Sequence, residues 1–412
     1  MHYFYTFELK SKYILVMDAY IIDAARSPVG KYGGTLSTIR PDDMVATVIS
    51  ALVQRNPWLD VNQIEEIVLG AANQSGEDNR NVARMAVLLA GLPNSIGGIT
   101  VNRLCASGLQ AIGDAARALN SGEGSIYIAG GVESMSRAPM VMSKATSAFD
   151  RGQQLFDTTI GWRFTNKKFP ADYIISMGET AENVAKQWGI SREEQDAFAA
   201  NSQAKYQAAH EARKFNDELI EIEIDKGKGE KIAFAKDEHP RLSTLADLAK
   251  LKPAFAKDGS VTAGNSSGIN DGAAATIIVN EAVVKKNSLK PMVRIVAMAA
   301  AGVEPSIMGV GPIPAVKKAL SRAGLKMNDI GLVELNEAFA AQSIACMRDL
   351  DIDPAIVNVN GGAIAIGHPL GCSGTRITTT LLHEMSRRNV RYGVATMCIG
   401  VGQGLAIVYE RV

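Results

Sequence analysis

The chain has 412 residues, its 43 lysines and arginines balance 43 aspartates and glutamates, and 47% of its residues are hydrophobic. This composition is typical of a globular protein with two or three domain-sized cores, and the balanced charge gives no electrostatic footprint for nucleic acid or an anionic membrane. The four cysteines are too few for a disulfide framework, and the five histidines are never spaced as metal ligands, so we expect free thiols and no metal site.

Residues 1–16 precede the first strand pattern, which opens at Met17 with DAYIIDAARSPVG. They lack the long apolar stretch and the small-residue cleavage site of a signal peptide. No run of 18 apolar residues occurs in the chain, so we expect no membrane-spanning segment. The expectation is a cytoplasmic protein with an N-terminal extension that its activity does not need.

An internal duplication organises the rest of the chain. Three pairs of segments match, polar to polar and apolar to apolar, at nearly the same offset. They are 61–72 with 327–338, 104–112 with 371–379, and 125–133 with 393–404. Each half therefore runs helix, strand, loop, small-residue elbow, helix, strand and glycine-rich turn. Strands that alternate with helices predict an α/β fold.

The segment between the two halves, roughly 139–257, has a different character. It contains an amphipathic helical stretch rich in alanine, glutamate and lysine at 179–215 and a charged turn at 225–231. This composition predicts an insertion on the surface of a two-lobed core. A cap over a ligand and a simple surface decoration both remain possible uses.

Cys105 is the first residue that suggests chemistry. An apolar strand pattern ends near Leu104, and an alanine-rich helical pattern begins at about Ala106. A cysteine at this junction lies at a helix N-terminus, where the dipole and free N–H groups stabilise a thiolate. An unperturbed thiol has a pKa of about 8.5, so this help raises the reactive fraction near neutral pH. The alternative is a buried cysteine that only fills space.

Two polar residues of the second half are further candidates. Asn336 follows an apolar strand, where its amide could orient water or a carbonyl; alternatively it caps the next helix. His368 lies in the glycine-rich stretch 358–374, and Pro369 keeps it off helical backbone. A histidine there can take a proton from a cysteine, as nucleophilic catalysis requires, or can merely satisfy hydrogen bonds of the loop.

Cys398 ends an apolar run and precedes Gly400, Gly402 and Gly404. A dinucleotide-binding fingerprint would need a following helix and an acidic residue about 20 positions later, and the sequence reaches Val412 without them. Glycines beside a cysteine instead predict exposed backbone amides that can hold a developing oxyanion.

Taken together, five segments resemble the signature segments of the thiolase family, and the likeness runs from about Met17 to Val412. The segments are VNRLCASG, TAGNSSGINDGAA, NEAFA, GGAIAIGHPLGCSG and CIGVGQG. The resemblance implies a thiolase fold, in which two duplicated α/β halves form a layered αβαβα core with an inserted loop domain. It also implies a homo-oligomer, a tetramer assembled from tight dimers.

The expected domain organisation follows from the duplication and the resemblance. Its parts are an extension at 1–16, the N-terminal half at 17–138, a CoA-binding loop insertion at 139–257, the completion of the N-terminal half at 258–290, and the C-terminal half at 291–412.

The resemblance also implies a role for each candidate. Cys105 would accept the acyl group, with His368 assisting its deprotonation. Cys398 would carry the proton of the acetyl-CoA α-carbon or of the leaving enolate. Asn336 would hold a water that, with His368, stabilises the thioester enolate. The backbone amides of Cys105 and Gly400 would stabilise the tetrahedral intermediate of acyl transfer.

Two rival classes are set against this assignment. Relatives that condense acyl chains on carrier proteins generally lack the second cysteine, so Cys398 favours a thiolase. A lipid-binding protein of the same fold would be expected to lose the cysteine–histidine set. Cys346 and Cys372 lack the NRLCASG context, although Cys372 aligns with Cys105 in the duplication, and we predict that both only pack.

Coenzyme A and acyl-CoA are implied as substrates, with no tightly bound cofactor. Ser267 would contact the pantetheine, Ala263 and Phe255 would lie beside it, and Arg241 would lie near the adenosine. Some short-chain members carry a histidine at the position of Ser176, which argues against simple acetoacetyl-CoA specificity.

Three segments, 72–93, 130–142 and 157–164, look like 3-oxoadipyl-CoA thiolases of aromatic-compound breakdown. That substrate has a free carboxylate, which needs a cation or strong donors when it is buried. Arg137 and Arg163 are candidates, and either could instead be a structural ion-pair partner. The alternative function is a general short- or medium-chain acetyl-CoA acetyltransferase of fatty-acid oxidation or acetoacetyl-CoA synthesis.

Overall fold

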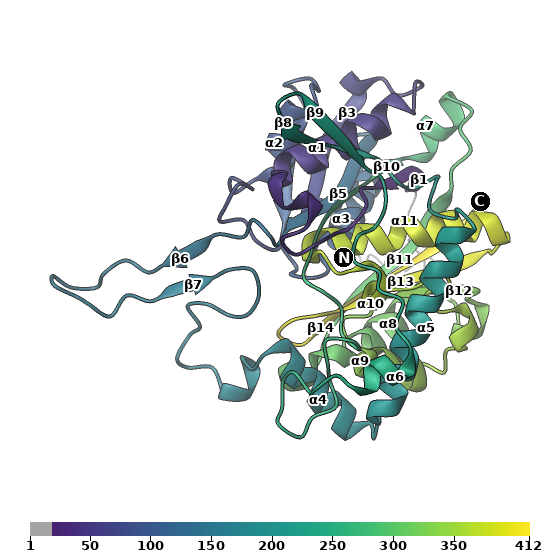
Figure 1. Cartoon of the computed structure of the whole chain (residues 1–412). Coiled ribbons are helices and arrows are strands. Elements are labelled where there is room, and N and C mark those ends of the chain that lie inside the picture. The colour runs from purple at the N-terminus through teal and green to yellow at the C-terminus, as the bar shows by residue number, and fades with distance from the viewer. Residues whose placement is uncertain (1–18) are drawn as a thin grey trace, which may run out of the picture.

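The computed structural model describes residues 19–412, so the extension expected at 1–16 lies outside the described residues. Their strands form a ten-stranded sheet with the order β12-β13-β14-β11-β1-β10-β5-β3-β4, and β2 pairs with β10 (Figure 1). The N-terminal strands are β1 (Tyr20–Arg26), β2 (Gly30–Lys31), β3 (Ile64–Gly70), β4 (Gly97–Val101), β5 (Ile126–Ser134) and β10 (Asn270–Val279). The C-terminal strands are β11 (Val293–Gly302), β12 (Leu332–Leu335), β13 (Tyr392–Ile399) and β14 (Gln403–Arg411).

The sheet contains the same strand arrangement twice, which confirms the duplication. From the centre outward, β1-β10-β5-β3 and β11-β14-β13-β12 each make two antiparallel pairings and then a parallel one. In place of β4, the C-terminal half has an isolated parallel bridge between Val333 and Val357. Within the described sheet, a short antiparallel pairing of β1 with β11 joins the halves, at Tyr20–Ile21.

The helices complete five layers. The central layer consists of α3 (Ser107–Ser121) and α11 (Leu370–Arg388), which contact each other and strands of both halves. The outer layers are α1 (Pro41–Gln54) with α2 (Val82–Leu89) on one side and α8 (Pro312–Ala323) with α9 (Ala340–Asp349) on the other. The remaining helices of the two halves are α7 (Glu281–Lys286) and α10 (Ala363–Ile366).

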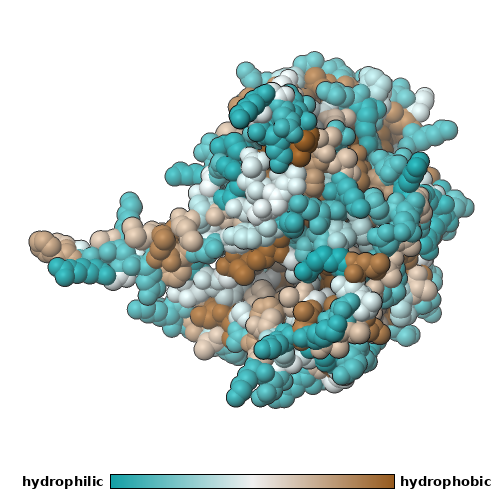
Figure 2. Space-filling model, viewed as in Figure 1, coloured by the Kyte–Doolittle hydropathy of each residue, from teal (hydrophilic) through white to brown (hydrophobic). Residues whose placement is uncertain are grey.

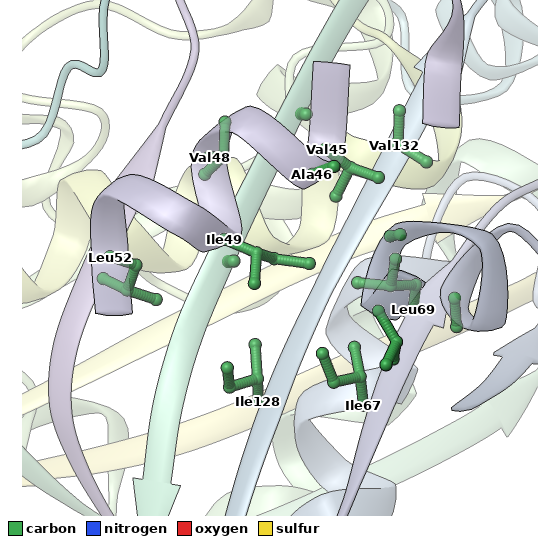
Figure 3. Packing of buried hydrophobic residues seen from close by; sticks show 14 of the residues in the cluster. Val45, Ala46, Val48, Ile49, Leu52, Ile67, Leu69, Ile128 and Val132 are labelled. Atoms are coloured by element: carbon green, nitrogen blue, oxygen red, sulfur yellow. The ribbon is translucent and has the colours of Figure 1, made fainter. Parts of the chain in front are cut away.

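Alternation along the buried strands separates the cores of these layers. In β5, Ile128 joins the outer core with α1 and α2, whereas Tyr127 and Ala129 join the central core with α3 and α11. Successive side chains of a strand point to opposite faces, so one apolar strand serves two cores. Figure 3 shows the outer core, where Ile49 and Leu52 of α1 pack toward the strands.

Glycines allow the two central helices to touch backbone to backbone. A Cβ at Gly108 would lie 2.7 Å from the carbonyl oxygen of Gly371, and one at Gly374 would collide with the backbone of Leu109. These residues all belong to the first two turns of α3 and α11. The contact therefore holds the N-terminal ends of the two helices beside each other.

The segment between the halves forms helices and two hairpins. They are α4 (Met177–Gln187), α5 (Arg192–Glu211), α6 (Leu245–Ala249), β6 (Met140–Met142) with β7 (Leu155–Asp157), and β8 (Ile222–Gly227) with β9 (Glu230–Phe234). The predicted helical stretch is interrupted between α4 and α5, because Gly189 adopts φ +59° and Ser191 caps the second helix. Figure 1 shows β6 and β7 projecting away from the body as an arm.

Short 3₁₀ turns connect several of these elements. They are η1 (Thr35–Thr38), η2 (Val61–Gln63), η3 (Ala171–Tyr173), η4 (Pro305–Val310), η5 (Met327–Asp329) and η6 (Pro354–Ile356). Within residues 19–412, no helix combines the length and the apolar character needed to cross a membrane.

Candidate functional site

Cys105 lies in a tight turn between β4 and α3, two residues before the helix begins. Leu104 has φ +48°, a conformation that non-glycine residues rarely adopt and that is common at functional turns. Hydrogen bonds hold this strain: Leu104 N–H donates to Asn102 Oδ1 at 2.8 Å, and the Ser107 hydroxyl donates to the Leu104 carbonyl at 2.6 Å. The turn thus presents the thiol beside the N-terminus of α3.

A second strained turn, which follows β13, lies next to the sulfur of Cys105. Val401 has φ +59°, which is unusual for a β-branched residue, and Gly402 follows with φ +75°. The turn directs the backbone N–H of Gly400 to the sulfur of Cys105, to which the N–H of Cys105 itself also donates. Cys398, the buried last-but-one residue of β13, lies near enough that the charge of Cys105 raises its pKa. The two cysteines and both predicted amides therefore meet at one place.

The electrostatic surroundings of Cys105 differ from the sequence-based expectation. The thiol is partly accessible to solvent, yet burial of its surroundings raises its pKa to about 11, against the lowering effect of the two N–H donors. The charge of Glu133 raises the pKa further. Desolvation outweighs the helix N-terminus here, so the resting thiol is protonated and needs a base.

The backbone position of His368 depends on the glycine before it. Gly367 adopts φ +113°, and a Cβ there would lie 2.6 Å from the side chain of Asn270. This close approach lets Asn270 Oδ1 accept the backbone N–H of His368 at 2.9 Å. Pro369 then caps α11. His368, like Cys105, therefore precedes the N-terminus of a central helix.

Hydrogen bonds of Ser373 determine which nitrogen of His368 is basic. Ser373 Oγ lies 2.7 Å from the carbonyl of Pro369 and 2.6 Å from His368 Nδ1. A carbonyl can only accept, so the hydroxyl proton is directed to Pro369 and Oγ accepts a proton from Nδ1–H. Nε2 then carries the free lone pair and is the base.

Replacing Ser373 with alanine is expected to lower the rate of acyl transfer to Cys105 by about 10- to 100-fold, because the imidazole loses its tautomer and orientation. Stopped-flow or quenched mass measurements of the acyl-enzyme would give this rate. Thr378→Ala is the matched control, since it removes a buried hydroxyl from the same helix, where Thr378 Oγ1 bonds the Gly374 carbonyl at 2.9 Å. Equal losses in the two variants would contradict the assignment.

The pKa of His368 is lowered to about 3 by its burial and by the positive charge of Arg376. The neutral, basic form therefore persists far below pH 6.5, the usual imidazole value. We expect the single-turnover acylation rate to change less than threefold between pH 8 and 5.5, where an ordinary histidine would lose about tenfold. Circular dichroism at both pH values would control for unfolding. A tenfold fall in the rate by pH 5.5 would contradict the lowered pKa of His368. Protonation of Glu133, whose pKa is about 7, would not cause such a fall, because losing its charge lowers the pKa of Cys105.

Asn336 faces the histidine and is not a helix cap. The next helix, α9, begins at Ala340 with Phe339 as its N-cap. The Asn336 side chain is fully buried, with Nδ2 3.4 Å from each ring nitrogen of His368. Its Oδ1 has no hydrogen-bond partner among the described residues. An amide in this position can orient a small polar group next to the imidazole.

Phe255 and Ser267 lie beside the segment that joins β12 to α9. Ser267 N–H donates to the Ala338 carbonyl at 2.9 Å, and the ring of the partly exposed Phe255 meets the edge of Phe339 at 6.1 Å between centroids. Phe339 packs in one apolar cluster with Cys398. These contacts place Phe255 and Ser267 beside Ala338 and Phe339, and Phe339 packs in the same cluster as the buried cysteine.

Two other predicted substrate contacts, Ala263 and Arg241, are exposed, and the side chain of Ser176 is engaged in a helix cap. Ala263 and Arg241 lie at the surface, and the backbone N–H of Arg241 donates to Gln203 Oε1 at 2.9 Å. Ser176 caps α4 in a reciprocal arrangement with Glu179.

The remaining cysteines are buried away from solvent. Cys346 lies in α9, where its sulfur contacts the Gly309 carbonyl at 3.4 Å. Cys372 lies inside the first turn of α11, which begins at Leu370, and burial raises its pKa to about 12. The expectation that Cys372 occupies the elbow corresponding to Cys105 is wrong in this detail, because α11 extends further toward its N-terminus than α3.

Sequence reasoning missed four residues of the site. Ser373 and Asn270 lie within quoted motif segments, so their positions were a usable signal. Trp162 packs its ring against Gly400, where an added Cβ would lie 3.0 Å from the ring, and nothing in the local sequence pattern predicted this contact. Glu133 accepts the N–H of Gly371 at 2.8 Å, and burial raises its pKa to about 7.

The two arginines proposed for a substrate carboxylate differ in their surroundings. Arg137 is bound to Glu77, whereas Arg163 has no ion pair or hydrogen bond to the described residues. No group of three or more potential metal ligands occurs in the described residues.

Comparisons with known proteins match nearly the whole described chain. Residues 19–282 match the model of the thiolase N-terminal domain, and residues 289–411 match that of the thiolase C-terminal domain. The chain is 54% identical to the beta-ketoadipyl-CoA thiolase of Pseudomonas knackmussii, covering 96% of this chain and 99% of that protein. It is also 54% identical to the 3-oxoadipyl-CoA/3-oxo-5,6-dehydrosuberyl-CoA thiolase of Escherichia coli K12, covering 96% and 100%.

A solved structure shows the same fold. Human mitochondrial 3-ketoacyl-CoA thiolase in complex with CoA superimposes with a TM-score of 0.89 at 40% identity, covering 97% of this chain and 99% of that one.

Proposed function

This chain belongs to the thiolase family, acyltransferases that use CoA thioesters, and from that premise we propose that it cleaves 3-oxoadipyl-CoA with free CoA into acetyl-CoA and succinyl-CoA. The choice of substrate rests on one observation. The chain is 54% identical, over nearly its full length, to thiolases whose names give this substrate. The proposed setting is the breakdown of aromatic compounds.

The proposed first step transfers the acyl group to Cys105. His368 Nε2 takes the thiol proton, and the sulfur attacks the C3 carbonyl of the substrate. The backbone N–H groups of Cys105 and Gly400, which point to the sulfur, would stabilise the resulting oxyanion. The C2–C3 bond then breaks, which leaves succinyl-Cys105 and the enolate of acetyl-CoA.

The remaining steps return every proton. Cys398 protonates the enolate carbon, while Asn336 and His368 face the position where the enolate oxygen would lie. Free CoA then gives its thiol proton to the Cys398 thiolate and attacks the succinyl thioester. The departing Cys105 thiolate recovers its proton from His368, so the enzyme is regenerated. Phe255, Ala263, Ser267 and Arg241 are the proposed contacts of CoA.

A substrate panel tests the proposal. Cleavage of 3-oxoadipyl-CoA, 3-oxohexanoyl-CoA and acetoacetyl-CoA would be followed with free CoA, and kcat/KM is expected to be highest for the first. A higher kcat/KM for acetoacetyl-CoA or 3-oxohexanoyl-CoA would instead indicate a general short- or medium-chain enzyme. No CoA-dependent cleavage of any of them would overturn the proposed activity.

We further propose that the chain forms a homo-oligomer, a dimer or tetramer. The arm formed by β6 and β7 exposes Met140, Met142 and Leu155 by 59%, 60% and 65%, and Figures 1 and 2 show it standing clear of the body with apolar residues on its surface. Strand β4 is an edge of the sheet and exposes Ile99. An exposed apolar arm and an unpaired strand edge favour contact with a second copy of the chain.

Light scattering after size exclusion is expected to give a mass of two or four times the 43.9 kDa of one chain. The double variant Met140→Lys, Leu155→Lys should lower the mass if the arm is an interface. A 44 kDa wild-type particle would contradict the prediction.

The expected division of the chain at 139–257 and 258–290, and a cytoplasmic location, belong to the same proposal. Strand β10 supports the division, because it pairs with β1 and β5 of the N-terminal half. The four cysteines are free thiols, which suits a reducing compartment.

A further inference from the structure

The proposed reaction leaves a charged group close to the nucleophile. Cleavage of 3-oxoadipyl-CoA puts a succinyl group on Cys105, and its carboxylate is only two methylene groups from the thioester carbonyl. A carboxylate held beside a protein surface and withdrawn from water needs a cation or strong hydrogen-bond donors. That partner must come from a segment adjacent to the Cys105 sulfur.

The loop at 158–164 is such a segment. Gly400 donates its backbone N–H to Cys105. A Cβ added at Gly400 would lie 3.0 Å from the ring of Trp162 and 3.3 Å from the side chain of Leu104, so both side chains pack closely against this glycine. The indole N–H donates to the Ile175 carbonyl at 3.2 Å, which fixes the ring. Trp162 therefore packs the loop against Gly400, the residue whose backbone N–H donates to the Cys105 sulfur.

The residue after this anchor is Arg163. The chain is also held on the other side of it, because Phe164 packs against Phe156 of β7 with 5.0 Å between ring centroids. Arg163 is half-buried between these two aromatic contacts. It makes no hydrogen bond or ion pair with any of residues 19–412, so its guanidinium has no competing partner in the described chain.

The other arginines of the region are already engaged. Arg137 makes a two-pronged contact with Glu77 and donates to the Ser37 carbonyl at 3.0 Å. Arg103, two residues before the nucleophile, donates to Gln110 Oε1 at 2.7 Å and to Gln403 Oε1 at 3.0 Å. Moving either one to a substrate would break contacts that already satisfy it.

We propose that Arg163 binds the terminal carboxylate of 3-oxoadipyl-CoA, and of the succinyl group carried by Cys105, and so selects acyl chains that end in a carboxylate. This inference rests on the proposed function and names its specificity-determining residue. Arginine suits the task because its planar guanidinium can bind a carboxylate through two parallel hydrogen bonds. Arg137 is then a structural residue.

The test compares two substrates that differ only at the chain end. 3-Oxohexanoyl-CoA has the carbon count of 3-oxoadipyl-CoA but a methyl group in place of the carboxylate. Arg163→Met is expected to lower kcat/KM for 3-oxoadipyl-CoA by about 10- to 100-fold and to change that for 3-oxohexanoyl-CoA by less than about threefold. Arg163→Lys should retain part of the preference, since it keeps the charge but not the two-pronged geometry.

Arg151→Met is the matched control. It removes an exposed arginine from the loop that joins β6 to β7, and neither substrate should be affected. A second readout follows the acyl-enzyme by mass. Arg163→Met should slow the succinylation of Cys105 by succinyl-CoA by the same 10- to 100-fold and leave butyrylation by butyryl-CoA within threefold.

The outcomes separate this inference from the function on which it rests. A wild-type enzyme that cleaves 3-oxohexanoyl-CoA but not 3-oxoadipyl-CoA would overturn the proposed substrate, and the role of Arg163 with it. A wild-type preference for 3-oxoadipyl-CoA that survives in Arg163→Met would overturn the role of Arg163 alone. Equal losses on both substrates would also overturn it, because they would indicate a disturbed loop rather than carboxylate recognition.

Discussion

The Cys105→Ser variant is expected to lose at least about 10⁴-fold in kcat for CoA-dependent cleavage and to form no acyl-enzyme detectable by mass. A serine hydroxyl keeps the shape of the turn but is a far weaker acid than the thiol. Burial already raises the pKa of the thiol to about 11, so the same surroundings leave a hydroxyl out of reach of a neutral imidazole. Binding of acyl-CoA should persist, because the residues proposed to hold CoA are untouched.

The controls for this variant are Cys372→Ala and Cys346→Ala. Both cysteines are buried in helices, and truncating either should lower thermal stability through a small cavity while kcat stays within about threefold. Mass measurement after incubation with acyl-CoA should locate the acyl group on Cys105 in both controls. An acyl-enzyme that survives Cys105→Ser but not Cys372→Ala would reverse the assignment.

The Cys398→Ala variant is expected to lower kcat for cleavage by about 10²- to 10⁴-fold, the usual contribution of a positioned acid or base. The affected step is protonation of the enolate carbon. Burial, followed by the charge of Cys105, raises the pKa of Cys398 well above its ordinary value, so this thiol holds the proton that the enolate needs. Acyl transfer from succinyl-CoA to Cys105 should suffer much less, because a CoA thiolate is a far better leaving group than an enolate and can depart even without the proton that Cys398 supplies in the wild type.

Two measurements separate these steps in Cys398→Ala. Exchange of the acetyl-CoA α-protons in deuterated water reports the carbon acid chemistry and should be lost with kcat. The rate of Cys105 succinylation by succinyl-CoA reports acyl transfer and should remain within about tenfold of wild type. Unchanged α-proton exchange in the variant would remove Cys398 from the proton transfer, whatever happens to kcat.

The fold was largely predictable because the two halves of the chain have similar sequence patterns. The match of 61–72 with 327–338 corresponds to β3 and β12, and the other two pairs correspond to α3 with α11 and β5 with β13. Two matching copies of the same hydrophobic pattern constrain the architecture more than either copy alone. The short pairing of β1 with β11 was not predictable, because it joins strands whose contact depends on how the halves pack.

For Cys105, local pattern and tertiary environment act in opposite directions. A strand followed by an alanine-rich helix is a local feature, and the sequence was enough to identify the turn and its cysteine. Desolvation is not local, since it arises from every element packed around the sulfur. The expectation of a more reactive free thiol therefore failed, while the choice of residue remains the proposal.

The hydrophobic pattern of the sequence was sufficient for a duplicated α/β fold and for the candidate residues Cys105, Asn336, His368 and Cys398, because such patterns are properties of the chain itself. The thiolase fold was implied by the resemblance of its motifs to that family. Only the packed structure could determine that Ser373 makes Nε2 of His368 the base, that Trp162 lies against Gly400, and that Arg137 is engaged while Arg163 is not. The last two facts depend on contacts between residues far apart in the sequence. The first depends on the turn that brings the Ser373 hydroxyl onto Nδ1 of His368, five residues earlier, and that geometry exists only in the folded chain.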